Sequence, residues 1–260
     1  MAPLLARLGL GRSGFGFGKR TVSGASGPSF SATILTASVV GFWPFKDDLN
    51  ADIGSHTTTA YGGVTSIQSS VKKWSDYSNS LLMSGSTSTS TGLRLSSATN
   101  WTWASGKTLE FWIYPINSGT TPGRMVTWGN REDNACFLIE RDNTNGTLYG
   151  RTNLSYVQLG TQVTTLNGWN WIVVSRSGTE IKVFLNGILS YTNANGFGGD
   201  GYTSDGQYFH ILGDYDTGYG SDPAFSRNGY AQDVIVYNAT PFHNLSSIDI
   251  PTISTTSRIV

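Results

Sequence analysis

Carboxylate pairs are the first chemistry to consider, because a retaining glycosidase needs two carboxyl groups about 5–5.5 Å apart across the sugar. The chain has four glutamates, Glu110, Glu132, Glu140 and Glu180. Glu140 and Asp142 begin a Glu-x-Asp-x-Glu pattern on one segment. The second glutamate of this pattern, or of its one-residue-longer form, is replaced by Thr144 and Asn145. We therefore predict that the acid and nucleophile pair is missing and that no residue is catalytic.

Histidine-based hydrolysis has as little support. His56, His210 and His243 are far apart in the sequence, and no Ser or Cys nucleophile lies in a recognisable turn. No phosphate-binding loop or dinucleotide fingerprint occurs, because the Gly-rich start follows no strand and opens no periodic helix. We expect a protein that is not an enzyme.

Aspartates gather in two polar segments that could offer oxygen ligands to calcium. The first holds Asp47, Asp48, Asn50 and Asp52, but Asx turns use the same residue types, and a turn is favoured here. The second segment is LGDYDTGYGSDP. Its carboxylates are the better candidates for a calcium site, and no other cofactor is expected: Asp214, Asp216 and Asp222.

Aromatic rings in polar loops could stack on sugars, since one face of a sugar ring is apolar and its edges form hydrogen bonds. The Gly- and Asp-rich stretch 195–223 carries four candidate glycan-binding residues, Tyr202, Tyr208, Tyr215 and Tyr219. Trp101 and Trp103 lie on one face if their segment is extended. We favour a buried pair between two sheets for these tryptophans, with sugar stacking as the alternative.

Alternating apolar residues predict the strands that must position such a site. In 108–115, Leu109, Phe111 and Ile113 point to one side, and the residues between them point to the other. The run 181–185 alternates in the same way, and Asn186-Gly187 after it predicts a tight type I′ hairpin. The apolar run 38–43 predicts a first strand, which Pro44 ends.

The strand TLEFWIYP, the hairpin GWNWIVVSRSGTEIKVFLNG and the strand GYAQDVIVYN follow one another in that order. Over roughly Val39 to Tyr237, this order resembles the concanavalin A-like, laminin-G-type jelly-roll superfamily of lectin and adhesion modules. The resemblance implies an all-β antiparallel jelly-roll sandwich. It also implies that the sandwich is a binding or structural module, although some relatives hydrolyse glycans. It also implies that Asp233 hydrogen-bonds a neighbouring loop rather than a metal.

Residues 1–30 differ from the rest of the chain, because they contain four basic residues, no acid and many glycines. Removing four from 17 basic residues leaves 13 against 17 acidic ones, so residues 31–260 carry a formal charge of −4. We predict an extended Gly-rich arm that docks on a larger assembly through Leu4, Leu5, Leu8, Arg12, Phe15, Phe17, Lys19 and Arg20. A solvated tail is one alternative, and contact with nucleic acid or another acidic surface, for which four charges interrupted by glycine are a weak basic patch, is the other. The sandwich is expected at 31–245, followed by an extended tail at 246–260.

A single cysteine, Cys136, excludes an intrachain disulfide and is expected to pack as a small core residue. The apolar start is interrupted by Arg7, which argues against a secretory signal. No run approaches the ~20 apolar residues of a membrane span. We therefore expect synthesis in a host cytoplasm without ordinary export.

These features favour a virion structural protein of bacteriophage type, such as a capsid decoration, knob or fibre protein. Its arm would bind capsid or tail proteins, and its sandwich would face outward. The alternative is a carbohydrate-binding adhesin or host-recognition lectin that binds cell-surface glycans. Exposed strand edges could support a homo-oligomer in either role, and no nucleic-acid partner is expected.

Overall fold

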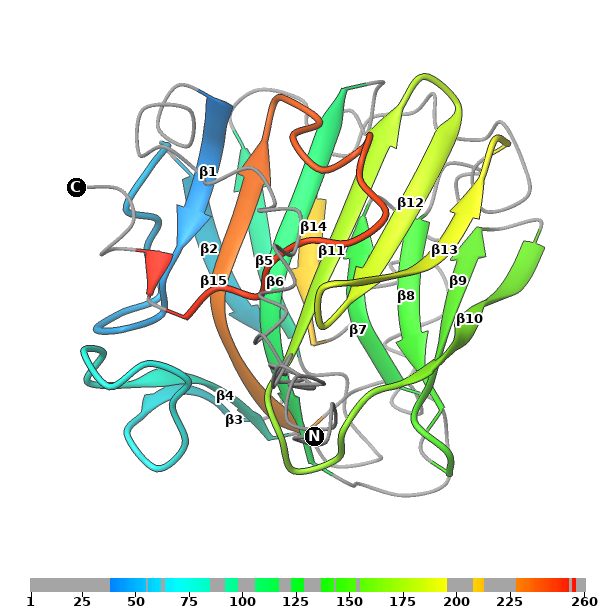
Figure 1. Cartoon of the computed structure of the whole chain (residues 1–260). Helices are drawn as coiled ribbons and strands as arrows, with labels where there is room; N and C mark the ends of the chain where they lie inside the picture. The colour runs from blue at the N-terminus through cyan, green and yellow to red at the C-terminus, as the bar shows by residue number, and fades with distance from the viewer. Residues whose placement is uncertain are drawn as a thin grey trace, which may run out of the picture.

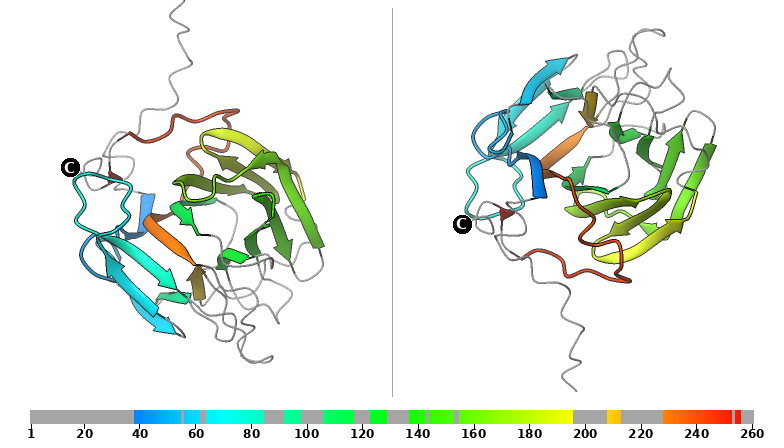
Figure 2. Two further views of the ribbon diagram at one scale, coloured as in Figure 1. Left: turned by 90° about the horizontal axis from the view of Figure 1, so that it is seen from below. Right: turned by 90° about the horizontal axis from the view of Figure 1, so that it is seen from above.

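The computed structural model describes residues 38–54, 56–61, 64–84, 92–97, 106–116, 123–128, 137–142, 144–152, 155–195, 208–212, 228–252 and 254–255. These residues form two antiparallel β-sheets that pack face to face (Figures 1 and 2). The predicted all-β sandwich is confirmed. Over the described ranges, no helix is long and apolar enough to cross a membrane.

The front sheet in Figure 1 has eight strands: β1 (Val39–Trp43), β3 (Val64–Gln68), β4 (Ser80–Ser84), β6 (Lys107–Pro115), β11 (Asn170–Ser177), β12 (Glu180–Leu185), β13 (Ile188–Asn193) and β15 (Gly229–Tyr237). Their order is β13-β12-β11-β6-β15-β4-β3, and β1 also pairs with β15. The strands predicted around 108–115, 181–185 and 38–43 are therefore β6, β12 and β1.

The second sheet has seven strands: β2 (His56–Tyr61), β5 (Gly92–Ser97), β7 (Gly123–Trp128), β8 (Phe137–Arg141), β9 (Thr147–Thr152), β10 (Ser155–Val163) and β14 (Tyr208–Ile211). Their order is β10-β9-β8-β7-β14-β5-β2. The two sheets meet along one side at their edge strands, β10 and β13. There the Ser190 hydroxyl donates a 2.6 Å hydrogen bond to the carbonyl of Leu159.

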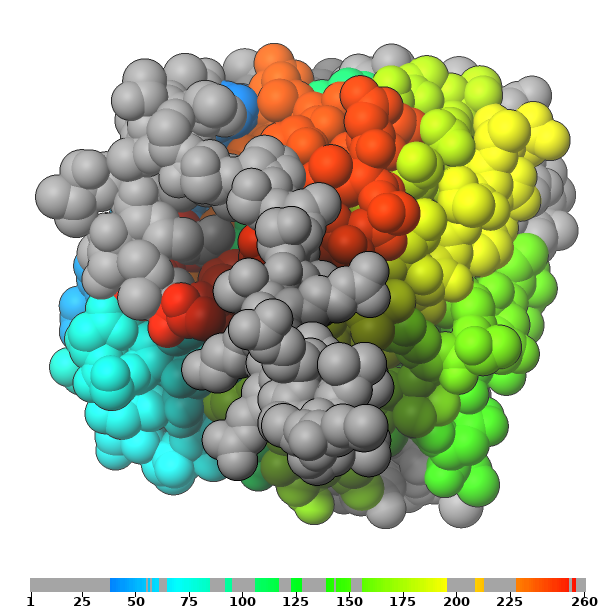
Figure 3. All heavy atoms as spheres, viewed as in Figure 1, coloured from blue at the N-terminus to red at the C-terminus, as the bar shows by residue number. Residues whose placement is uncertain are grey.

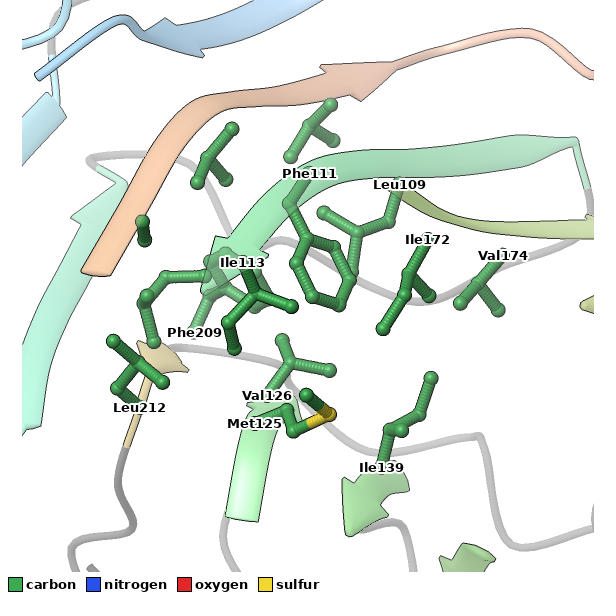
Figure 4. Close-up of a cluster of buried hydrophobic side chains, with 14 of the residues drawn as sticks. Leu109, Phe111, Ile113, Met125, Val126, Ile139, Ile172, Val174, Phe209 and Leu212 are labelled. Carbon is green, nitrogen blue, oxygen red and sulfur yellow. The ribbon is translucent and has the colours of Figure 1, made fainter. Parts of the chain in front are cut away.

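The core lies between the sheets, where apolar side chains from both inner faces point toward one another (Figure 4). Leu109, Phe111 and Ile113 of β6 are fully buried there, as the alternation predicts. They face side chains of the other sheet such as Val126 and Ile139. Burying each side chain of this size stabilises the fold by about 1.5–3 kcal/mol relative to leaving it exposed. This energy keeps the apolar face of each strand turned inward, so the opposite face remains for binding.

The predicted hairpin after β12 is also confirmed. Asn186 and Gly187 both have positive φ angles, 49° and 82°, as a type I′ turn requires. β12 and β13 pair in antiparallel fashion on either side of this turn. The Asn186 side chain accepts a 2.8 Å hydrogen bond from the Trp171 backbone N–H, which ties the turn to β11.

A second apolar layer covers the outer face of the eight-stranded sheet. We call it the outer aromatic cluster, and it consists of Trp74, Tyr77, Trp112, Trp171, Val173, Phe184, Phe242 and Ile248. Its last two members belong to residues 239–252, which with 254–255 we call the C-terminal strap. The strap runs across the front of the sheet in Figure 1 and lies on the molecular surface in Figure 3.

The strap is fastened at several points. The Ile248 N–H donates a 2.8 Å hydrogen bond to the Gly187 carbonyl, and Ser247 forms an isolated bridge with Ile188. His243 Nε2 lies 2.6 Å from Glu180 Oε2, and this hydrogen bond lowers the pKa of Glu180. The described residues after 245 are thus packed against the sandwich.

Candidate functional site

The outer face of the seven-stranded sheet carries polar and charged side chains. Across four adjacent strands, Thr59, Arg94, His210 and Thr127 are neighbours in register. Leu93, Phe209, Ile211 and Val126, the sequence neighbours of the last three, point into the core, so Arg94, His210 and Thr127 point the other way. Thr59 shares their face because it pairs with Arg94. Alternation along each strand therefore gathers a polar row on one surface.

His210 is almost fully buried in this row, with 1% of its surface exposed. Burial, together with the positive charges of Arg94 and Arg124, lowers the pKa of His210 to about 3. The imidazole is therefore neutral near pH 7 and is poorly suited to take up a proton from a substrate.

A second row crosses strands β7 to β10 and consists of Arg124, Glu140, Tyr149 and Gln158. Arg124 Nε lies 3.4 Å from Glu140 Oε1, and both side chains are almost fully buried. Glu140 is therefore held in an ion pair with a guanidinium.

Asp142, the other carboxylate of the interrupted pattern, caps the turn between β8 and β9. Its Oδ1 accepts a 2.7 Å hydrogen bond from the Thr144 N–H and a 3.4 Å hydrogen bond from the Asn145 N–H. The two residues that replace the second glutamate thus supply backbone donors to Asp142. Both carboxylates of Glu140-Arg141-Asp142 have structural partners, an ion pair for one and a turn for the other.

The exposed end of the second row is aromatic. The rings of Tyr149 and Tyr156 stack with centroids 4.6 Å apart and planes 8° apart, and Tyr156 is 50% exposed. Gln158, on the same face of β10 as Tyr156, is exposed and donates a 2.7 Å hydrogen bond to the Gly160 carbonyl. We call Tyr149, Tyr156 and Gln158 the tyrosine platform. It offers an apolar ring surface beside an amide and two phenolic hydroxyls.

The tyrosine platform was not among the predicted sites. Tyr149 and Tyr156 are seven residues apart, and neither lies in the Gly- and Asp-rich loops where recognition was expected. The available signal was the hairpin: Gln158 pairs with Tyr149, and Tyr156 pairs with Arg151, so the two tyrosines are diagonal neighbours on one face. The pair can be recognised only when the register of β9 and β10 is known, and no tight-turn motif in the sequence predicts that register.

Most of the predicted site residues lie outside the described residues. Tyr208 begins β14, but its side chain is outside the described part. Trp101, Trp103 and Cys136 also lie outside it. The remaining predicted site residues are also outside the described part of the chain: Tyr202, Tyr215, Tyr219, Asp214, Asp216 and Asp222 in the loops, and Leu4, Leu5, Leu8, Arg12, Phe15, Phe17, Lys19 and Arg20 in the arm.

The structure does describe the first aspartate cluster. Asp48 Oδ1 accepts a 2.8 Å hydrogen bond from the Asn50 N–H, which is an Asx turn, and Asp52 forms a 3.1 Å salt bridge with Lys46. The turn interpretation is confirmed for Asp48. Within the described ranges, no group of three or more His, Cys, Asp or Glu side chains is placed to hold a metal ion.

Asp233 has the role that the resemblance implies. Its carboxylate accepts hydrogen bonds from Trp74 Nε1 at 2.8 Å and from the Tyr77 hydroxyl at 2.6 Å. Both donors belong to the loop between β3 and β4. A third hydrogen bond, of 3.0 Å, comes from the Thr255 N–H of the C-terminal strap. Asp233 is therefore a structural centre that joins two segments to β15.

Two packed antiparallel sheets with this strand order define a lectin-like β-sandwich of concanavalin A type. The chain belongs to the concanavalin A-like lectin/glucanases superfamily: the Laminin_G_3 family model matches residues 86–241, which is more than half of the chain. None of the curated proteins matches the chain.

Solved structures with a similar fold have very different sequences. Domain 4 of an extracellular GH43 arabinanase from Geobacillus stearothermophilus, in complex with arabinotriose, is 15% identical, with a TM-score of 0.55 over 78% of this chain and 93% of that chain. The binding domain of botulinum neurotoxin serotype D is 13% identical, with a TM-score of 0.54, over 80% of this chain and 50% of that chain. A Trypanosoma rangeli sialidase mutant is 14% identical, with a TM-score of 0.55, over 79% of this chain and 31% of that chain. These similarities concern the fold.

Proposed function

We propose that this protein is a non-enzymatic carbohydrate-binding protein and that its tyrosine platform holds the sugar. The observation that supports this proposal is the stacked pair of Tyr149 and Tyr156 on neighbouring strands, with half of Tyr156 exposed. A sugar ring has an apolar C–H face that packs on an aromatic ring. The Gln158 amide lies on the same face of β10, within reach of sugar hydroxyls. The family and the arabinotriose complex of the similar arabinanase domain support the same ligand class.

The proposed absence of catalysis is supported by the occupied carboxylates. A hydrolase needs one carboxyl group free to give a proton and a second free to attack or to activate water. Glu140 is paired with Arg124, and Asp142 caps a turn. Prolonged incubation with oligosaccharides that bind should release no new reducing ends.

Binding is tested with purified full-length protein on a panel of neutral oligosaccharides that includes arabinotriose. We expect weak binding to at least one of them, and a loss of about tenfold in Tyr156→Ala, because the exposed stacking surface is removed. Val163→Ala is the matched control, since Val163 is on the same strand and is 52% exposed. Equal binding by the wild type and Tyr156→Ala, at unchanged melting temperature, would remove the platform from the proposal.

A second proposed role concerns where the sandwich is displayed. Residues 1–30 combine leucine and phenylalanine with glycine and four positive charges, whereas residues 31–260 carry a formal charge of −4. This composition supports an arm that docks on capsid or tail proteins of a phage-type virion after synthesis in a host cytoplasm. A single sugar ring on a tyrosine binds weakly, and many copies on one particle would raise the avidity toward cell-surface glycans. A homo-oligomer would act in the same way.

The display proposal is tested without shortening the chain. Phe15 and Phe17 are changed together to Ser, and Val163→Ala again serves as the control. Capture of capsid or tail proteins from a lysate by the wild type and Val163→Ala, but not by the double variant, is the expected result. If all three capture the same capsid or tail proteins, or none does, the arm is not the anchor.

A further inference from the structure

A lysine ammonium lies in a corner formed by two tryptophans on the outer face of the eight-stranded sheet. Lys73 Nζ is 4.2 Å from the ring centroid of Trp112 and 5.0 Å from that of Trp74. The two indoles meet nearly at right angles, with an interplanar angle of 84° and centroids 5.4 Å apart. The quadrupoles of both rings attract the cation and hold it at this place.

The backbone around Lys73 is fixed as well. Its N–H donates a 2.6 Å hydrogen bond to Gln232 Oε1, and the same glutamine donates through Nε2 to the carbonyl of Asn79. Trp74 is held by its hydrogen bond to Asp233. β15 therefore fixes the backbone of Lys73, and the two indoles hold its ammonium before any ligand arrives, which lowers the entropic cost of binding.

Among the described residues, the charge at this corner has no anionic partner. In the described part of the chain, no carboxylate pairs with Lys73, and no oxygen accepts a hydrogen bond from its ammonium. Lys73 is partly buried, and the loss of part of its hydration lowers its pKa. A second donor, the buried Nε1 of Trp112, also has no hydrogen-bond acceptor among the described residues.

Partly exposed aromatic rings adjoin the corner. Tyr114 follows Trp112 on the same face of β6, about 7 Å along the strand. Its ring packs against Trp169 at 5.6 Å and against Tyr230 at 5.8 Å. Ser70 Oγ and the Tyr230 hydroxyl, 3.0 Å apart, add polar groups.

We propose that Lys73, with Trp112 and the adjoining Tyr114 and Trp169, forms a second binding site, which takes an acidic sugar. Its ammonium would hold a carboxylate or a sulfate ester. The rings one sugar length away would pack against the apolar face of the pyranose. This site lies on the opposite sheet from the tyrosine platform, so the two bind independently and differ in the charge of their ligands.

The test measures binding of full-length wild type, Lys73→Met and Lys72→Met to three probes at low salt. The probes are an oligogalacturonate, which carries carboxylates, a sulfated galactan oligosaccharide, and the unsulfated galactan oligosaccharide. Lys72 is the matched control, because it is the adjacent lysine and is exposed. Met keeps the length and the apolar stem of lysine, so packing on Trp112 is retained. Melting temperatures confirm that each variant is folded.

We expect an acidic probe to bind the wild type and Lys72→Met, and to bind Lys73→Met at least tenfold more weakly. Lys73→Arg should recover most of the affinity, since it restores the charge. Preference between the carboxylate and the sulfate probe assigns the anion. The inference is overturned if neither acidic probe binds, or if the two methionine variants lose affinity equally. The neutral probe and Tyr156→Ala report the tyrosine platform separately, so that failure of one site is distinguishable from failure of the other.

Discussion

The indole Nε1 of Trp74 donates a 2.8 Å hydrogen bond to Oδ2 of Asp233, which joins the loop between β3 and β4 to the centre of β15. Asp233 has a positive φ of 47°, and the register between β15 and β6 shifts between Gln232 and Ile235. The strand that pairs with the other edge of β15 also changes at this position: the first half of β15 pairs with β4 and the second half with β1. The bulge turns the carboxylate toward the loop and the strap instead of a neighbouring strand.

Asp233→Asn should lower the free energy of unfolding by about 2–4 kcal/mol, because a buried charged acceptor of several hydrogen bonds becomes an amide with one acceptor oxygen. Urea denaturation followed by tryptophan fluorescence measures the loss. Asp249→Asn is the control, since Asp249 is exposed, and it should change stability by less than about 0.5 kcal/mol. Similar small losses in both variants would show that Asp233 does not fasten the loop.

His210 should make the protein less stable at mildly acidic pH. The unfolded imidazole takes up a proton below its ordinary pKa of about 6.5, whereas the folded one does so only near a pKa of about 3. The unfolded state therefore binds more protons between these values, and stability falls as the pH falls from 6.5 toward 3. The expected loss is about 2 kcal/mol at pH 5 relative to pH 8.

His210→Gln checks this assignment, since glutamine is polar and does not titrate. The variant should lose the pH dependence between 6.5 and 5 while remaining folded. Melting temperatures at pH 8, 6 and 5 measure it. An unchanged pH slope in the variant would assign the acid sensitivity to another group.

Gly187→Ala should detach the strap. Gly187 has a φ of 82°, and an added Cβ would clash with the carbonyl of Ile248, so the hairpin and the strap cannot both keep their positions. We expect a loss of more than about 2 kcal/mol and faster proteolysis after residue 238. Gly178→Ala is the matched control, because Gly178 also has a positive φ, 59°, but open space at its Cβ. It should cost only about 1 kcal/mol of backbone strain. Equal losses would mean that strain alone, and not strap contact, explains both.

The buried ion pair of Arg124 and Glu140 gives a fourth prediction. Glu140→Gln leaves a guanidinium buried beside a neutral amide and should cost about 3–5 kcal/mol. The double variant Arg124→Met, Glu140→Leu should lose less than the sum of the single variants, because both charges of the pair are then removed together. A double-mutant cycle in urea measures the coupling. Additive losses would show that the two side chains do not act as a pair.

Much of the sandwich could be predicted from local pattern. The alternation around Phe111 and Ile181 gave the face of β6 and β12 that lines the core, and Asn186-Gly187 gave the hairpin and its pairing. These features depend on side chains two residues apart or on two turn residues, so short segments suffice. The candidate sites were less predictable. The tyrosine platform depends on the register of β9 and β10, and the Lys73 site depends on how the loop between β3 and β4 packs on β6. The loops favoured for glycan binding lie outside the described residues.

By itself, the sequence determined the class of fold, the inward face of its central strands and the interruption of the carboxylate pattern at Thr144 and Asn145. Only the tertiary structure decided that Tyr149 stacks on Tyr156, that Lys73 meets Trp112, and that Asp233 holds Trp74 and Tyr77. The physical reason is distance along the chain: Asp233 lies 159 residues from Trp74 and 156 from Tyr77. Hydrophobic alternation fixes which way each strand faces, but the packing of two whole sheets is needed to choose its neighbours.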